Sequence, residues 1–270
     1  MRAALLGLAG PAVLLAACGE NLTPPGEGEP SPPLACVPDL DGVLTAEEIP
    51  LVLGATAPYL IGGDVAVDVA GEGAGATRRW DWSVERRDDT AADLGAVALD
   101  RQWYASAFPG GQFVAAGAGG LDGVYARDAA AIYLLGLASP TMEPASARTL
   151  LAYDAPVAVL RFPLVEGDAW TATGTITGGT LAGLPYSGAD VYELSADASG
   201  ELHLPYVRFT RALRLRTRVV STPAVGGVVT SRRQVSFWFE CMGELGRATS
   251  RADEPAADFT IASELRRFAL

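Results

Sequence analysis

The sequence predicts an all-β protein built on a large curved antiparallel sheet or a β-sandwich, with few short helices. Three observations support this fold class: apolar and polar residues alternate over many short segments, Gly and Pro turns separate them, and helical periodicity is nearly absent. The chain has 270 residues, of which 49% are hydrophobic, 31 are Gly and 18 are Pro. A helical pattern is present only at Thr45–Leu53 and Ala91–Leu99, so we expect short helices there.

The two longest strands are predicted at Val207–Val219 and Val228–Glu240, joined by a turn at residues 222–227. Their alternation predicts a hairpin with one buried face and one face in water. Ten shorter strands are expected at Val65–Val69, Arg79–Val84, Val124–Arg127, Ala131–Leu135, Val157–Leu160, Trp170–Thr177, Ala189–Ala196, Glu201–Leu204, Leu245–Ser250 and Phe259–Ser263.

The N-terminus carries a targeting signal. Arg2 precedes an uncharged apolar run, and the run ends in Leu15-Ala16-Ala17-Cys18, which resembles the lipobox of bacterial lipoproteins. The resemblance implies that residues 1–17 are a signal peptide and that the Cys18 thiol carries a lipid, which would anchor the protein to a membrane. In that family Gly19, rather than Asp, after the cysteine indicates the outer membrane. The alternative is an ordinary secretory signal with an incidental cysteine.

Residues 18–35 are rich in Pro, Gly and Glu, which is typical of an extended tether. Residues 36–270 then suit one all-β domain, or two with a boundary near residues 140–148.

With Cys18 lipidated, Cys36 and Cys241 remain as an even pair. Export to an oxidising compartment favours a disulfide between them. The alternative is two separate buried thiols.

The composition excludes several classes of chemistry. All 20 basic residues are Arg, so a Walker A lysine and a Schiff-base lysine are excluded. One His and three Cys are too few for a multi-histidine zinc site or a four-cysteine cluster. The net charge of −12 argues against nucleic acid as a partner.

Residues 37–48 resemble an EF-hand calcium loop. Aligning Gly42 with the glycine of that motif makes Asp39, Asp41 and Glu48 the candidate metal ligands, although Val37 replaces the usual first aspartate. The alternative is a turn in which Thr45 caps a short helix and Glu48 completes a capping box. No cofactor other than calcium is expected.

Charge is segregated along the chain. Residues 206–239 contain seven arginines and no acid, whereas residues 3–77 contain ten acids and no base. We expect an exposed basic face that binds an anionic glycan, a lipid or a partner protein. The alternative is charge compensation inside the protein, for example by Glu193 and Asp197. The residues expected on this face are Arg208, Arg214, Arg216, Arg218 and Arg232.

Residues 75–250 are similar to a loosely defined group of uncharacterised bacterial secreted or envelope β proteins. The resemblance rests on Trp80-Asp81-Trp82-Ser83, Phe108-Pro109, and the segment Leu160–Leu164 followed by Gly167 and Trp170. It implies an envelope β protein with no known activity. We therefore expect a membrane-anchored lipoprotein with a non-catalytic binding or structural role. The alternative is a tethered hydrolase that uses two facing carboxylates, such as Asp81 and Glu193, as glycosidases do.

Overall fold

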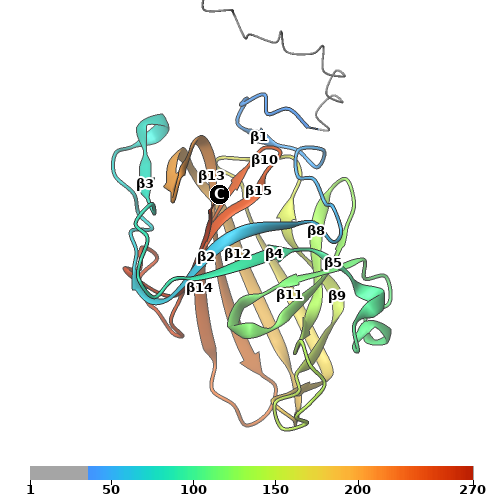
Figure 1. Cartoon of the computed structure of the whole chain (residues 1–270). Coiled ribbons are helices and arrows are strands. Elements are labelled where there is room, and N and C mark those ends of the chain that lie inside the picture. The colour runs from blue at the N-terminus through green and yellow to red at the C-terminus, as the bar shows by residue number, and fades with distance from the viewer. Residues whose placement is uncertain (1–35, 270) are drawn as a thin grey trace, which may run out of the picture. The chain divides into compact units, whose positions relative to one another are not determined.

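The computed structural model describes residues 36–269. The proposed signal peptide, Cys18 and the tether lie outside these residues. The described part confirms the all-β prediction and shows the large curved sheet (Figure 1). Its elements are β1 (Val43–Leu44), β2 (Thr56–Ala66), η1 (Gly75–Thr77), β3 (Arg79–Asp81), β4 (Thr90–Gly95), β5 (Val97–Ala98), η2 (Leu99–Arg101), η3 (Ala105–Ala107), β6 (Phe113–Ala116), η4 (Ala118–Gly120), β7 (Asp122–Arg127), β8 (Ala131–Ala138), β9 (Leu150–Arg161), β10 (Leu164–Val165), β11 (Ala169–Leu181), β12 (Leu184–Leu204), β13 (Val207–Pro223), β14 (Thr230–Phe239), β15 (Gly243–Ser250) and β16 (Ile261–Phe268).

The sheet is an antiparallel meander that closes almost completely on itself. Neighbouring strands follow the order β4-β2-β16-β15-β14-β13-β12-β11-β9-β8-β7-β6-β5. The last strand, β16, pairs with β2 near the start of the domain. At the other edge, β5 pairs with β6, and β5 is separated from β4 by one residue. The two sheet edges therefore belong to a single stretch of chain, residues 90–98.

This closure explains why the helix predicted at Ala91–Leu99 is wrong. Residues 90–95 pair with β2, and residues 97–98 pair with β6. The short apolar pattern is compatible with either a helix or a strand, and unpaired edges on both sides select the strand.

Both faces of the curled sheet are buried in places. The inner face carries a core built from β8, β9, β11, β12 and β13. On the outer face, residues 67–84 cover β12–β16, with Trp80 and Trp82 as the largest covering side chains. Residues 99–108 cover β6–β8 in the same way. The two indole N–H groups donate to the carbonyls of Val69 and Asp68, at 3.2 and 2.8 Å. Trp80 and Trp82, on which part of the resemblance to envelope β proteins rests, therefore pack the covering segment against the sheet.

The N-terminal segment closes one end of the sheet. β1 pairs with β10, while Leu44, Ala46 and Ile49 join the inner core. The Arg127 guanidinium donates to the carbonyl oxygens of Ala46 and Ile49. Residues 45–49 form a turn, so the helix predicted at Thr45–Leu53 is also wrong. Tertiary contacts hold this segment, which is too short to be helical without them.

The predicted disulfide is present. Cys36 and Cys241 are bonded, and their Cα atoms lie 5.5 Å apart. Cys241 lies in the turn between β14 and β15, and its N–H donates to the Glu48 carbonyl at 2.7 Å. The bond therefore ties the closing segment to the sheet.

Residues 139–149 connect β8 to β9 within this sheet, and residues 36–269 belong to one compact unit. Across residues 36–269, no helix is long and apolar enough to cross a membrane.

Breaking the disulfide is expected to lower the free energy of unfolding by up to about 4–5 kcal/mol, since it closes a very long loop in the unfolded chain. Denaturant unfolding with and without reductant measures this loss. The Cys36→Ser/Cys241→Ser variant should have the same free energy of unfolding as the reduced protein, and adding reductant should not change it. An unchanged unfolding midpoint on reduction would contradict the expectation.

Candidate functional site

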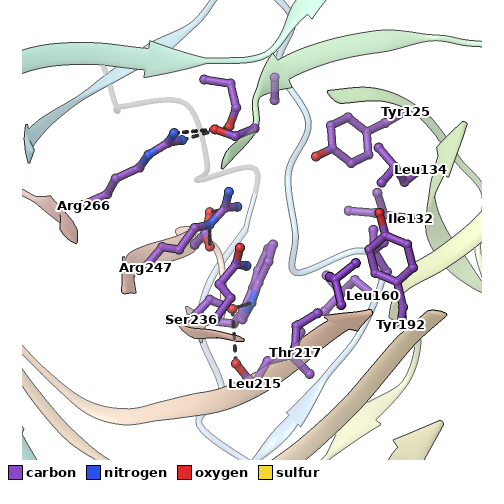
Figure 2. A pocket seen from close by; sticks show the side chains of 18 of the residues that line it. Tyr125, Ile132, Leu134, Leu160, Tyr192, Leu215, Thr217, Ser236, Arg247 and Arg266 are labelled. Carbon is purple, nitrogen blue, oxygen red and sulfur yellow. Dashed lines mark hydrogen bonds and ion pairs between the residues drawn. The ribbon is translucent and has the colours of Figure 1, made fainter. Parts of the chain in front are cut away.

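The inside of the curled sheet contains a cavity of about 680 Å³, which we call the lumen. Figure 2 shows two walls that differ in chemistry. One wall, from β7–β9 and β12, is apolar and aromatic, with Tyr125, Ile132, Leu134, Leu160 and Tyr192. The opposite wall, from β13–β16, is mainly polar, with Leu215, Thr217, Ser236, Arg247 and Arg266.

Strand register places the polar side chains in the lumen. Paired residues on neighbouring antiparallel strands share a face of the sheet. The pairs give three successive rows: Tyr192, Val219 and Arg232; then Leu194, Thr217 and Gln234; then Leu215, Ser236, Arg247 and Arg266. One face thus becomes more polar from β12 to β16.

Two of the luminal arginines already have partners. Arg247 bonds both oxygens of Glu244, at 2.7 and 2.6 Å. Burial disfavours its charge, but Glu244 outweighs burial and raises the pKa of the Arg247 guanidinium. Arg266 pairs with Glu264 at 2.7 Å and donates across the lumen to the carbonyl of Ala116 at 2.8 Å. The charge of each arginine is thus paired with an acid on its own strand, and Arg266 also ties β16 to the end of β6.

A buried carboxylate lies on the apolar side. Asp190 accepts a 2.7 Å hydrogen bond from the Tyr153 hydroxyl, which is also 2.7 Å from the Tyr192 hydroxyl. Burial raises the pKa of both phenols, so they stay neutral and serve as hydrogen-bonding groups. Among residues 36–269, Asp190 forms no ion pair.

Several polar side chains that line the lumen are uncommitted, and three of them lie on neighbouring rows of β13 and β14. Within the described chain, the side chains of Thr217, Gln234 and Arg232 make no hydrogen bond or ion pair. Thr217 and Gln234 are paired in register, and Arg232 lies one row nearer the loop that connects β13 to β14. Arg232 is exposed, so this row lies where the lumen meets solvent.

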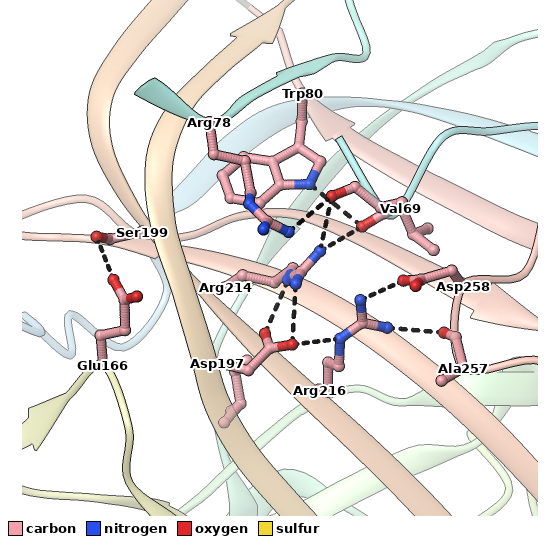
Figure 3. A network of polar contacts seen from close by, with 12 residues as sticks. Val69, Arg78, Trp80, Glu166, Asp197, Ser199, Arg214, Arg216, Ala257 and Asp258 are labelled. Atoms are coloured by element: carbon pink, nitrogen blue, oxygen red, sulfur yellow. Dashed lines mark hydrogen bonds and ion pairs between the residues drawn. The ribbon is translucent and has the colours of Figure 1, made fainter. Parts of the chain in front are cut away.

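The expected basic face is not one surface. Arg214 is only 2% exposed, and its guanidinium lies 5.1 Å from the ring centroid of Trp80 (Figure 3). It bonds both Asp197 oxygens, at 2.8 and 2.9 Å, and the Val69 carbonyl at 2.7 Å. Arg216 shares Asp197 at 2.7 Å and also pairs with Asp258. These arginines fasten the covering segment, as the charge-compensation alternative predicts.

The other three arginines complete this correction. Arg208 pairs with Glu201 at 3.2 Å and Arg218 with Glu193 at 3.0 Å. Arg232 pairs in register with Val219, which faces the lumen, whereas Arg218 pairs with Arg233 on the outer face. The prediction that Arg232 shares a face with Arg214, Arg216 and Arg218 is therefore wrong, because the hairpin register offsets the two strands by one residue.

The EF-hand-like loop forms a turn whose third carboxylate was not predicted. Asp39 and Asp41 each accept a backbone N–H two residues ahead. Their carboxylates and that of Glu240 lie within 4.8 Å of one another. Glu48 instead accepts the N–H and hydroxyl of Thr45, both at 2.8 Å. The bond to the Thr45 N–H is the one that the capping-box alternative predicts for Glu48, but the short helix of that alternative is absent from residues 45–49. No linear motif could identify Glu240, because only the fold brings it here. Calcium binding stays a prediction.

The carboxylates considered for hydrolysis do not face each other. Asp81 pairs with His203 on β12, ten residues from Glu193, or about 33 Å along the strand. Of the two acids that line the lumen, Asp190 shares a row with Thr230, and Glu244 pairs with Trp238. Eight residues of β14, about 26 Å, separate them. Glycosidase pairs lie within about 10 Å.

No family model, curated protein or solved structure matches this chain.

Asp197→Asn is expected to lower the free energy of unfolding at pH 7 by about 2–4 kcal/mol, because buried Arg214 loses its charged partner. Burial opposes ionisation of Asp197, but Arg214 and Arg216 outweigh it and hold its pKa below the ordinary 3.8. The stabilisation is therefore complete above about pH 5 and lost as the pH falls through the lowered pKa.

Denaturant unfolding between pH 2 and 8 measures this effect. The difference between wild type and Asp197→Asn should shrink below about pH 4. Glu193→Gln, at the exposed Arg218 pair, is the control and should change stability by about 0.5 kcal/mol or less. A difference that stays constant down to pH 2 would contradict the account.

Proposed function

We propose that this protein is a cell-envelope lipoprotein, anchored through Cys18 in the outer membrane, that binds an amphiphilic small molecule in its lumen. Its role is non-catalytic. The observation that supports binding is the lumen itself, which combines a large apolar wall with uncommitted polar groups near one end.

The size and chemistry of the lumen fit such a ligand. A volume of about 680 Å³ lies in the range of small-molecule sites, about 300–1,000 Å³. An apolar chain would lie against Ile132, Leu134 and Leu160. A polar head group would meet Thr217 and Gln234, which lack protein partners in the described chain.

Arg232 favours an anionic head group. It is the luminal arginine without an acidic partner among residues 36–269, since Arg247 and Arg266 are paired. A guanidinium can bind a carboxylate or phosphate through two parallel hydrogen bonds. We therefore propose that the anionic ligand binds in the lumen, at Arg232, and not on an outer strand face.

The envelope location is supported by the lipobox-like sequence and by the disulfide. Disulfides form and persist in oxidising compartments, to which an exported lipoprotein is delivered. Gly19 after Cys18 favours the outer membrane.

Filling the lumen is expected to block binding. Val219→Trp projects an indole into the cavity, whereas Val220→Trp places the same group on the outer face of β13. Fluorescence titration with dansylundecanoate, an anionic amphiphile, should show affinity at least about tenfold weaker for Val219→Trp only. Equal binding by wild type and both variants would place the probe outside the lumen.

Replacing Arg232 is expected to affect the charged probe alone. Arg232→Gln should weaken dansylundecanoate binding about fivefold to tenfold, the value of one charge-assisted contact in a partly exposed site. The methyl ester of the probe should bind wild type and variant equally. Arg208→Gln, at an exposed arginine outside the lumen, is the control. A loss of ester binding as large as the loss of acid binding would contradict a role for charge.

A further inference from the structure

Three loops meet at the end of the sheet opposite the disulfide. They are the β8–β9 loop (residues 139–149), the β11–β12 turn (residues 181–184) and the β13–β14 loop (residues 223–229). Backbone hydrogen bonds link neighbouring segments here: Gly183 N–H of the turn donates to Arg148 O at 2.8 Å, and Ala224 N–H donates at 2.9 Å to Ser187 O, near the start of β12. They therefore form one continuous surface, the apolar tip, at the lower end in Figure 1.

The apolar tip exposes aliphatic side chains. Val225 is 90% exposed, Val228 79% and Leu184 69%. Three further apolar side chains of the tip are exposed to a smaller extent: Met142, Leu181 and Val229. Grouped apolar side chains of this kind mark an interaction surface, whereas single exposed ones are ordinary.

Charge is excluded from the two hairpins that form most of the tip. Residues 169–189 and 219–231 contain no Asp, Glu, Lys or Arg. The outer side of β11 carries threonines instead, at positions 171, 173, 175 and 177. The third segment of the tip, the β8–β9 loop, carries the exposed Glu143 and the half-buried Arg148. The uncharged surface that can enter the interface of a lipid bilayer is therefore formed by the ends of the two hairpins.

We propose that the apolar tip docks onto a lipid bilayer. The length of the tether favours a bilayer, rather than a second copy of the chain, as the surface that the tip contacts. Cys36 follows Cys18 by 18 positions, a stretch of chain that spans at most about 60 Å. β14 runs for about 33 Å between the disulfide end and the tip. A domain anchored through Cys18 can therefore lay its tip on the membrane that holds its anchor.

Docking would place the lumen beside the lipid. Thr230 and Arg232 line the lumen and directly follow the tip residues Val228 and Val229. An amphiphile leaving the bilayer would meet the lumen there. The docking proposal does not depend on the luminal ligand, since either can fail alone.

The test uses the full chain carrying Cys18→Ser and a single added cysteine labelled with the fluorophore NBD. Val228→Cys reports on the tip, and Val52→Cys, 63% exposed at the opposite end, is the matched reporter. Vesicles of phosphatidylcholine with one quarter phosphatidylglycerol are added at low and high salt. The tip label should shift to the blue at both salt concentrations, and the label at position 52 should not shift.

The Val225→Asp/Val228→Asp variant should bind vesicles on the order of tenfold more weakly in flotation, because two aliphatic contacts are lost and two charges are added. The Val52→Asp/Leu53→Asp variant should bind like wild type. Both variants should still bind dansylundecanoate, which separates this outcome from failure of the lumen. No shift at position 228 would overturn the proposal. A blue-shifted tip label before vesicles are added would also overturn it, in favour of a second copy or of residues 1–35 as the occupant.

Discussion

The closure of the sheet is the constraint on which the rest of the structure depends. β2 must pair with β16, and residues 90–98 must pair with both β2 and β6. Closure removes free backbone edges and converts one face of a long meander into an enclosed interior. The lumen, its two walls and the outer covering segments all follow from that geometry.

Arginine holds the closed sheet together. Arg127, Arg214, Arg266 and Arg267 each donate to backbone carbonyls far away in sequence, and three of them also pair with an acid. Arg267 is fully buried with Asp89 and the carbonyls of Trp82 and Val84. A planar guanidinium can satisfy several fixed acceptors at once, which a lysine ammonium does less well. The absence of lysine therefore fits the way this fold is fastened.

The lumen and the apolar tip are complementary. The polar rows on β13–β16 lead toward Arg232, and the uncharged hairpins end just beyond it. The disulfide and the closing segment seal the opposite end, where the chain continues toward Cys18. One end of the sheet is thus covalently secured, and the other presents aliphatic loops to its surroundings.

The sequence by itself determined the all-β class and predicted the long hairpin and the Cys36–Cys241 bond, because alternation and an even cysteine pair are local or compositional signals. It also located the arginine-rich stretch and the acids Asp39 and Asp41. Only the tertiary structure decided that residues 91–99 close the sheet, that Glu240 joins the acidic loop, and that Arg214 is buried while Arg232 faces the lumen. Each depends on register or on contacts between distant strands. A one-residue offset exchanges the inner and outer faces without changing the alternation of the sequence.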